Sequence, residues 1–259
     1  MNGKVVYTVI TGGYDALKPP EAQAADGWDF VCFTDGIGLP RGEAETATWK
    51  LRPIPWRCQD DPARLSRFPK LNPHLVLPEY DRSLYIDANM RLTDKLLARA
   101  NEELARGEIC AMCRHPDRGC VYREAVELLD LGVGEPKKIF AQTKFLLGRG
   151  YPARAGLHQC NIILRAHNDP RVVAFSEAWW GMFSRFSRRD QMAADPALRE
   201  AALVPAELLT PGEAAELLAK PHTSKPHPFF PLHKFNRLRC KSRALRLRMF
   251  LRANGIDAC

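Results

Sequence analysis

The sequence predicts an α/β protein in which a mixed, mainly parallel sheet is flanked by helices. Short β-branched runs alternate with segments of helical periodicity over roughly 200 residues, which is the pattern of a layered α/β sheet. The chain has 259 residues, a length that suits one large domain or a domain with an appendage. Composition changes near residue 220, so we expect a main domain over residues 1–220. A Pro/His-rich linker and a basic helical tail would occupy residues 221–259.

Two strands are predicted near the N-terminus, and an aspartate follows each of them. Residues 5–10 form a β-branched run that enters the glycine turn "TGGYD", which contains Asp15. The run "FVCFT", residues 30–34, is a second strand that ends at Asp35. Each of these strand ends therefore places a carboxylate just beyond the strand.

A loop-rich region and a short helix come next. Prolines break residues 37–61, where residues 49–51 form a possible short strand. Asp61 is a predicted helix cap and Pro62 occupies a first helical position, which together predict a short basic helix. We expect Pro69 to interrupt that helix, because proline lacks the backbone N–H that a helix needs.

Strands and helices then alternate along the rest of the main domain. Their apolar periodicity predicts strands at residues 83–87, 108–113 and 160–167, and helices at residues 93–106, 121–131 and 170–186.

Composition and charge bear on compartment and partners. No window approaches the roughly 18 consecutive apolar residues of a membrane span, and the N-terminus lacks a signal-peptide pattern. We therefore expect a cytoplasmic protein. The net charge is +8, and ten Lys and Arg residues lie between positions 217 and 256, where no Asp or Glu occurs. Subtracting these ten leaves −2 for the rest of the chain, so the basic character belongs to the tail.

The segment "RSLYIDANM", residues 82–90, ends a predicted strand with two oxygen-bearing side chains, Asp87 and Asn89. Ligand sites of open α/β sheets lie just beyond the carboxyl ends of strands. Such a pair can direct two oxygens toward Mg²⁺ or Mn²⁺, which then keeps water and substrate phosphates as its other ligands. The alternative is an ordinary strand-to-turn Asp/Asn pair that binds nothing.

Basic residues lie just upstream of this strand. Arg64, Arg67 and Lys70 in "RLSRFPK" are spaced so that some share a helical face. Arginine binds phosphate oxygens through paired N–H groups, and lysine binds them as a point charge. A solvated basic face is the alternative. Anion-binding donors beside cation-binding oxygens suit a nucleoside diphosphate.

A cysteine-rich segment, "CAMCRHPDRGC", contains Cys110, Cys113, His115 and Cys120 and could suggest a zinc site. On a strand, however, positions i and i+3 point to opposite faces, which argues against shared coordination by Cys110 and Cys113. We therefore favour buried thiols, reduced because the chain shows no export signal.

Several segments together resemble a glycosyltransferase-like family: "YTVITGGYDAL", "DFVCFTD", "DPARLSRFPKLNPHLVLPEYDRSLYIDAN", "HPDRGCVYREA", "GLHQCNIILRAHND" and "WWGMFSRFSRRDQ". This family was long catalogued as a domain of unknown function and occurs in plant Golgi proteins of pectin and mucilage synthesis and in bacterial polysaccharide loci. The likeness spans residues 4–191, and residues 61–89 are its most specific part. The layout is more distantly similar to retaining transferases of the galactosyltransferase and glycogenin type. The resemblance thus implies a GT-A-like, Rossmann-like sheet.

The resemblance also implies transfer from a nucleoside diphosphate sugar, with a UDP-sugar as the expected donor, to a glycan or lipid-linked acceptor. Asp87 and Asn89 would hold Mn²⁺ or Mg²⁺, weakly, because the family's usual second acid is Asn here. "PHTSKPH" resembles a His…Lys-Pro motif that would add His222 to the metal and Lys225 to the diphosphate. Its prolines leave open that this segment is simply a linker.

The other site residues are assigned by the same resemblance. Thr11, Gly13, Tyr14 and Asp15 would line the nucleoside pocket with Asp35 nearby; Arg64, Arg67 and Lys70 would face the diphosphate or donor sugar; Asn161 would lie near the transferred sugar; Asp190 and Gln191 would lie near the reacting carbon. The family motif "HPDRGCVYREA" supplies His115, Arg118, Cys120, Tyr122 and Glu124, to which the sequence assigns no role. His115 could reach the cleft or form structural hydrogen bonds.

Two mechanisms remain open for Asp190. In an inverting reaction it is the candidate base for the proton of the acceptor hydroxyl. In a retaining reaction, which the resemblance favours, the leaving phosphate can take that proton and Asp190 would position the sugar. The plain alternative is a surface ion pair with Arg188 or Arg189, worth under ~1 kcal/mol.

The tail segment "KFNRLRCKSRALRLRMFLR", residues 234–252, combines eight basic residues with scattered large apolar ones. It predicts an imperfect amphipathic helix of the kind that adsorbs to anionic lipid, which would place the protein at the inner face of the cell membrane. Packing on the domain is the second interpretation. Nucleic-acid binding comes last, and we expect no such partner because aromatic residues are few in this segment.

Two other functions stay open. A metal-dependent hydrolase of a phosphate ester or lipid amide could use the same strand-end oxygens, although such sites usually gather more ligands than stand beside Asp87. The second function is that of a non-catalytic relative that binds carbohydrate or lipid. It stays open because the family usually has an acidic residue at the position of Asn89. The donor sugar and the acceptor depend on loop side chains, whose positions the sequence does not fix.

Overall fold

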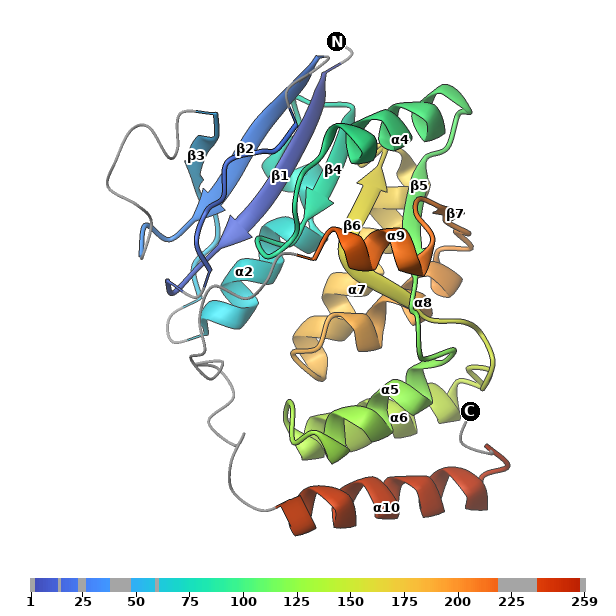
Figure 1. The fold of residues 1–259 in the computed structure, drawn as a ribbon. Coiled ribbons are helices and arrows are strands. Elements are labelled where there is room, and N and C mark those ends of the chain that lie inside the picture. Colours follow the sequence, from blue (N-terminus) through green and yellow to red (C-terminus); the bar gives the residue numbers. More distant parts are fainter. Residues whose placement is uncertain are drawn as a thin grey trace.

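A sheet of seven strands forms the centre of the molecule, and Figure 1 shows helices on both of its faces. The computed structural model describes residues 3–13, 15–22, 27–37, 48–58, 61–218 and 237–256. Within these ranges the strand order is β3-β2-β1-β4-β6-β5-β7.

One half of the sheet is parallel. It consists of β1 (Lys4–Ile10), β2 (Trp28–Thr34), β3 (Lys50–Pro53) and β4 (Arg82–Ile86). β1 lies between β2 and β4 and is buried from Val5 to Ile10, as its continuous apolar run requires. Because these strands are parallel, the carboxyl ends of β1 and β4 meet at one edge of the sheet.

The other half is mixed. β6 (His158–Arg165) is antiparallel to β4 and to β5 (Cys110–Arg114), and β7 (Ala206–Glu207) is parallel to β5. Met112 pairs with Ile163, but the next residue, Cys113, pairs with Gln159. Residues 160–162 therefore have no β5 partner, and such a bulge redirects side chains.

Helices α2 (Pro62–Leu71), α3 (Pro73–Val76), α7 (Pro170–Arg185) and α8 (Gln191–Glu200) cover one face of the sheet. Phe175, Trp179 and Phe183 of α7 share a buried cluster with Tyr7 and Tyr85 of the sheet. The opposite face packs against α4 (Asp94–Ala105) and α9 (Pro211–Glu216). Both faces of the central strands are therefore covered, as in α/β proteins generally.

A third layer contains α5 (Val121–Asp130), α6 (Pro136–Gly148) and α10 (Arg237–Ala253), at the end of the molecule away from the sheet (Figure 1). Ala244, Leu247 and Leu251 of α10 are buried in one cluster with Leu128 and Leu129 of α5. The packing interpretation of the tail is thus confirmed for this helix. The division near residue 220 stays a prediction, because residues 219–236 lie outside the described ranges.

The predicted fold class, a mixed and mainly parallel sheet flanked by helices, is confirmed. The expected interruption at Pro69 is wrong, because α2 continues to Leu71 and the Asn72 N–H donates to the Phe68 carbonyl at 3.0 Å. A proline removes its own N–H but leaves the bonds of the following residues intact. Helices α6, α8 and α9 were not expected. Among the described helices, none is long and apolar enough to cross a bilayer.

Candidate functional site

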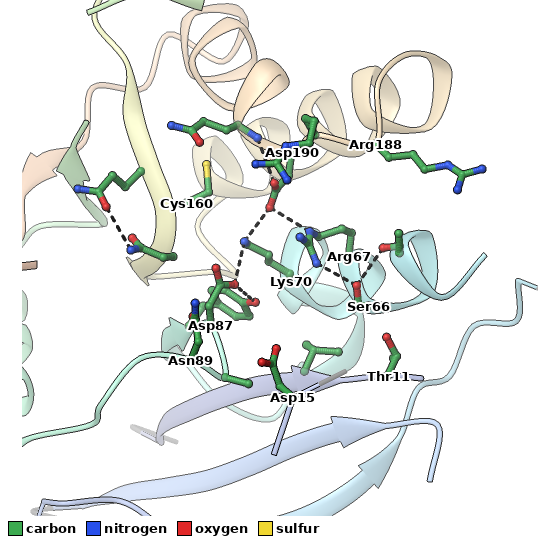
Figure 2. Close-up of a pocket in the computed structure, with 18 of the residues that line it drawn as sticks. Thr11, Asp15, Ser66, Arg67, Lys70, Asp87, Asn89, Cys160, Arg188 and Asp190 are labelled. Atoms are coloured by element: carbon green, nitrogen blue, oxygen red, sulfur yellow. Dashed lines mark hydrogen bonds and ion pairs between the residues drawn. The ribbon is translucent and has the colours of Figure 1, made fainter. Parts of the chain in front are cut away.

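A cavity of about 330 Å³ opens at the carboxyl ends of β1 and β4, between α2, β6 and the start of α8 (Figure 2). Most of the residues predicted for the site line it, and these are Thr11, Asp15, Arg67, Lys70, Asp87, Asn89, Asn161, Asp190 and Gln191. Segments far apart in sequence thus meet where the ligand site of an open α/β sheet is expected.

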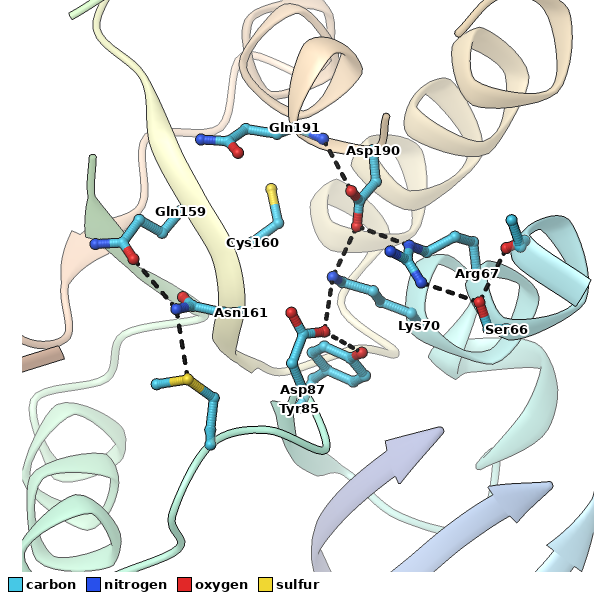
Figure 3. A network of polar contacts seen from close by, with 12 residues as sticks. Ser66, Arg67, Lys70, Tyr85, Asp87, Gln159, Cys160, Asn161, Asp190 and Gln191 are labelled. Carbon is cyan, nitrogen blue, oxygen red and sulfur yellow. Dashed lines mark hydrogen bonds and ion pairs between the residues drawn. The ribbon is translucent and has the colours of Figure 1, made fainter. Parts of the chain in front are cut away.

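Lys70 joins two carboxylates at the centre of the cavity wall (Figure 3). Its Nζ lies 2.7 Å from Asp190 Oδ2 and 3.2 Å from Asp87 Oδ1, and it stands 4.7 Å from the centre of the Tyr85 ring. Only 2% of its side chain is exposed. A lysine buried this deeply requires carboxylate partners, and it has two.

The last turn of α2 is held in place by the sheet. The Lys70 carbonyl accepts from the Tyr7 hydroxyl at 3.2 Å and from the Arg165 guanidinium at 2.8 Å. One turn earlier, Arg67 donates to Ser66 Oγ at 2.9 Å and to Asp190 Oδ2 at 3.1 Å. These contacts fix the two basic side chains before any ligand arrives.

Asp190 caps α8 and is surrounded by donors. Besides Lys70 and Arg67, the Gln191 N–H donates to its Oδ1 at 3.2 Å, and the Trp179 indole donates to its carbonyl at 2.8 Å. Burial raises the pKa of Asp190, but the charges of Lys70 and Arg67 outweigh burial and hold that pKa below its ordinary value. Asp190 is 6% exposed, so the alternative of a surface ion pair is wrong. A carboxylate with a lowered pKa is a weak base.

Asp87 is placed by the pairing of β4 with β6. Its N–H donates to the Asn161 carbonyl at 2.8 Å, and the Tyr85 hydroxyl donates to its Oδ1 at 2.6 Å. Burial and then Asp87 raise the pKa of Tyr85 well above its ordinary value, so the phenol keeps its proton. Since Tyr85 and Lys70 both use Oδ1, the other carboxylate oxygen remains for a ligand.

Two amide oxygens near Asp87 are buried without a hydrogen-bond partner among the described residues, Asn89 Oδ1 and Asn161 Oδ1. Asn161 turns its NH₂ toward Gln159 Oε1 at 3.2 Å, which leaves its oxygen unpaired (Figure 3). Buried acceptors of this kind usually have a partner, so both oxygens are open to a ligand that enters the cavity.

These oxygens fit a hard cation. Asp87 supplies one carboxylate and Asn89 with Asn161 supplies neutral oxygens, which is the donor chemistry that Mg²⁺ and Mn²⁺ prefer. A single negative ligand implies weak binding, and the described residues contain no group of three His, Cys, Asp or Glu that could hold a metal. His222, Lys225 and Tyr14, which were also predicted for the site, lie outside the described residues.

The glycine turn borders the cavity on the other side. Asp15 lines it, and burial followed by the charge of Asp87 raises the pKa of Asp15, so these two acids face each other. Gly12 and Gly13 have φ values of 65° and 62°, a conformation that glycine tolerates best. The Gly12 N–H donates to Asp35 Oδ2 at 2.8 Å, so Asp35 supports the turn from behind.

Among the predicted residues that the structure describes, three do not line the cavity. Asp35 borders a neighbouring groove instead, and Gly13 only shapes the turn. Arg64, expected to face the diphosphate, lies 3.2 Å from Asp61 Oδ2 at the start of its own helix. Arg64 stands six positions before Lys70, so the two side chains point about 120° apart around the helix, and Arg64 pairs with the cap residue Asp61 instead of facing the cavity.

Sequence reasoning missed several lining residues, which are Ser66, Tyr85, Gln159, Cys160 and Arg188. Tyr85 could have been found, because it stands two positions before Asp87 and so shares a face of β4. Gln159 and Cys160 could not, because the bulge in β6 breaks the alternation on which such an inference depends.

His115 lies in the cavity wall and is also fixed structurally. Its Nδ1 accepts from the N–H groups of Asp117 and Arg118 at 3.1 Å each, and Arg118 pairs with the buried Glu124 at 2.5 Å. Burial and then Arg118 lower the pKa of His115 to about 4, so the ring is neutral near pH 7. Tyr122 is structural, because its hydroxyl donates to the Tyr151 carbonyl at 2.7 Å.

The cysteines of strand β5 lie as the alternation of side chains along a strand predicts. Cys110 and Cys113 are free thiols, and they belong to the clusters on opposite faces of the sheet. The expectation of a reduced thiol is wrong for Cys120, which is disulfide-bonded.

Comparison with known proteins gives a family model and ten matching chains of solved structures, two of which are described below. The family model described as TOD1/MUCI70, glycosyltransferase-like domain, matches residues 2–202. No curated protein sequence matches the chain significantly. Mouse xyloside xylosyltransferase 1 shares 10% identity at a TM-score of 0.46, over 80% of this chain and 85% of that one. The bifunctional glycosyltransferase WbbM gives the same identity and TM-score over 80% of this chain and 39% of its own.

Proposed function

Because the chain belongs to the TOD1/MUCI70 glycosyltransferase-like domain family, we propose that it transfers a sugar from a nucleoside diphosphate sugar to a hydroxyl of a glycan or lipid-linked acceptor. A UDP-sugar is the donor that we put first, and a weakly held Mn²⁺ or Mg²⁺ would assist. The reaction would contribute to the synthesis of a polysaccharide or glycoconjugate.

One observation carries this proposal: buried basic groups and unpaired oxygens face the same cavity. Lys70 and Arg67 offer fixed positive charge, while Asn89 and Asn161 offer acceptors without partners among the described residues. A diphosphate with its counter-cation needs both kinds of group, and a plain sugar-binding site needs neither.

The leaving diphosphate would be stabilised by groups already in position. Asp87, Asn89 and Asn161 would hold the cation, which as a Lewis acid would neutralise part of the developing charge. Lys70 and Arg67 would contribute N–H donors, and the burial of Lys70 would strengthen its interaction with the developing charge.

Asp190 is better suited to positioning than to proton abstraction. Its carboxylate accepts from Lys70, Arg67 and the Gln191 N–H, and its pKa is lowered. These contacts would orient the basic groups toward the donor, and the acceptor proton would then go to the departing phosphate. This role supports a retaining reaction.

Calorimetric titration with UDP, GDP and CMP, with and without Mn²⁺, tests the proposal. We expect UDP binding that strengthens with Mn²⁺ and is lost in Asp87→Ala, while Asp130→Ala on α5 serves as a matched control. Release of phosphate or fatty acid from model esters without any acceptor would indicate a hydrolase instead. Absence of nucleotide binding in the folded protein would overturn the proposal.

A further inference from the structure

Helix α10 presents two separate apolar stripes, and only one of them is covered. Ala244, Leu247 and Leu251 are buried against α5. Leu238, Leu245 and Met249 are 80%, 55% and 62% exposed. These three are spaced seven and four residues apart, so they form one stripe along the helix, on the side away from α5.

Basic side chains flank the exposed stripe. The exposed ones on α10 are Arg237, Arg239, Lys241, Arg246, Arg248 and Arg252. The helix contains no acidic residue, and none of these six forms an ion pair with a carboxylate among the described residues. Their charge is thus available to an anionic partner outside the protein.

The helix also lies where a flat partner can reach it. Figure 1 shows α10 along the end of the molecule opposite the sheet, and no other helix or strand of the described residues lies on its outer side. Two exposed lysines of the adjacent α6, Lys137 and Lys144, add to the positive charge, and Lys144 Nζ stands 5.6 Å from the centre of the Phe250 ring.

We propose that the outer face of α10 binds an anionic lipid surface with the helix axis parallel to the membrane. Arginine and lysine would pair with lipid phosphates, while Leu238, Leu245 and Met249 would enter the boundary between headgroups and acyl chains. Large apolar side chains in the middle of the basic face favour lipid over nucleic acid, whose phosphate backbone offers them no apolar medium. The inference is independent of the nucleotide site.

Flotation of the full chain with vesicles tests this surface. We expect binding to phosphatidylcholine vesicles that contain phosphatidylglycerol, little binding to pure phosphatidylcholine, and weakening at high salt. Leu245→Ser/Met249→Ser should reduce binding about tenfold or more, because the apolar contribution is lost. The matched control, Leu75→Ser/Val204→Ser, removes two apolar residues elsewhere that are at least as exposed as Leu245, at 58% and 87%, and should bind as the wild type does.

Three results would overturn the proposal: no flotation with anionic vesicles, equal loss in the control variant, or binding to duplex DNA or RNA that exceeds binding to the vesicles. Urea denaturation of both variants checks that they fold. UDP titration of the same variants should be unchanged, so a failed membrane surface and a failed nucleotide site give different results.

Discussion

At the scale of single residues, Lys70 determines the charge balance of the site. Its ammonium contacts Asp190 and Asp87, and 8% of the Asp190 side chain and 33% of the Asp87 side chain are exposed. The ion pair of Lys70 with Asp190 is therefore shielded from solvent, whereas its ion pair with Asp87 is accessible to a ligand. Removal of the lysine would leave Asp190 buried with one remaining ion-pair partner on α2, Arg67.

Substitution of Lys70 by methionine is expected to lower the free energy of unfolding by up to about 3–5 kcal/mol, the cost of breaking a buried ion pair, because Asp190 then keeps only Arg67 as its ion-pair partner on α2. Lys70→Met/Asp190→Asn should recover part of that loss, because the uncompensated charge is then absent. Urea denaturation of the single and double variants measures both. Equal destabilisation in the two variants would mean that lost packing, and not charge, dominates.

The lowered pKa of Asp190 predicts how stability depends on pH. A group whose pKa is lower in the folded state stabilises the fold above its unfolded value, here 3.8, and loses that contribution as pH falls further. The gap in unfolding free energy between wild type and Asp190→Asn should therefore be constant above about pH 5 and shrink below that value. Urea denaturation between neutral pH and about pH 3 measures it, and a gap that widens in acid would contradict the assignment.

The sequence identified some of the site residues that stand on or next to regular elements. Asp87, Lys70 and Arg67 could be predicted because strand ends and helical spacing set their directions. The partnership of Lys70 with Asp190 could not be, because it joins residues 120 positions apart through a tertiary contact. A contact between residues so far apart in the sequence leaves no local sequence pattern from which it could be predicted.

At the scale of elements, the start of α2 controls where the basic side chains lie. Asp61 Oδ1 accepts from the Arg64 N–H at 3.1 Å, while its Oδ2 pairs with Arg64 at 3.2 Å and with Arg188 at 3.3 Å. One side chain thus caps the helix and ties it to the segment before α8. We expect that the direction of Arg67 and Lys70 depends on this cap.

Asp61→Ala should lower the free energy of unfolding by about 1–2 kcal/mol, the usual cost of losing an N-cap, and should also weaken UDP binding. Asp61→Asn keeps the cap acceptor and should lose less than half as much. Asp169 caps α7 in the same way, with the Arg171 N–H at 2.9 Å, so Asp169→Ala is the matched control. That control should lose similar stability but retain UDP binding, and equal loss of binding in both would contradict a local role.

Elements with strong periodicity were predicted, and those that depend on tertiary context were not. The buried strands β1, β2 and β4 have apolar runs, a pattern that is typical of strands in the interior of a parallel sheet. Helix α8 was missed because Pro196 lies inside it, which argues locally against a helix. The antiparallel direction of β6 was also missed, because a single strand carries no signal of direction.

At the scale of the whole molecule, the three buried clusters show that the basic tail helix is part of the fold. Two clusters lie on the two faces of the sheet, and the third joins α5, α6 and α10. Tyr122 and Met192 belong to this third cluster, so the layer also supports the start of α8, where Asp190 lies. Stability of the tail and geometry of the site are therefore linked through α8.

Two leucines of α10 test this architecture, because they are the same residue type two positions apart in the same basic sequence. Leu247 is fully buried against α5, whereas Leu245 is 55% exposed. Leu247→Ala should therefore lower the free energy of unfolding by about 2–5 kcal/mol, the cost of a core cavity. Leu245→Ala should change it by less than about 0.5 kcal/mol, as surface substitutions usually do. Urea denaturation of both variants measures these two changes in the free energy of unfolding. If α10 did not pack on the domain, both changes would be equally small.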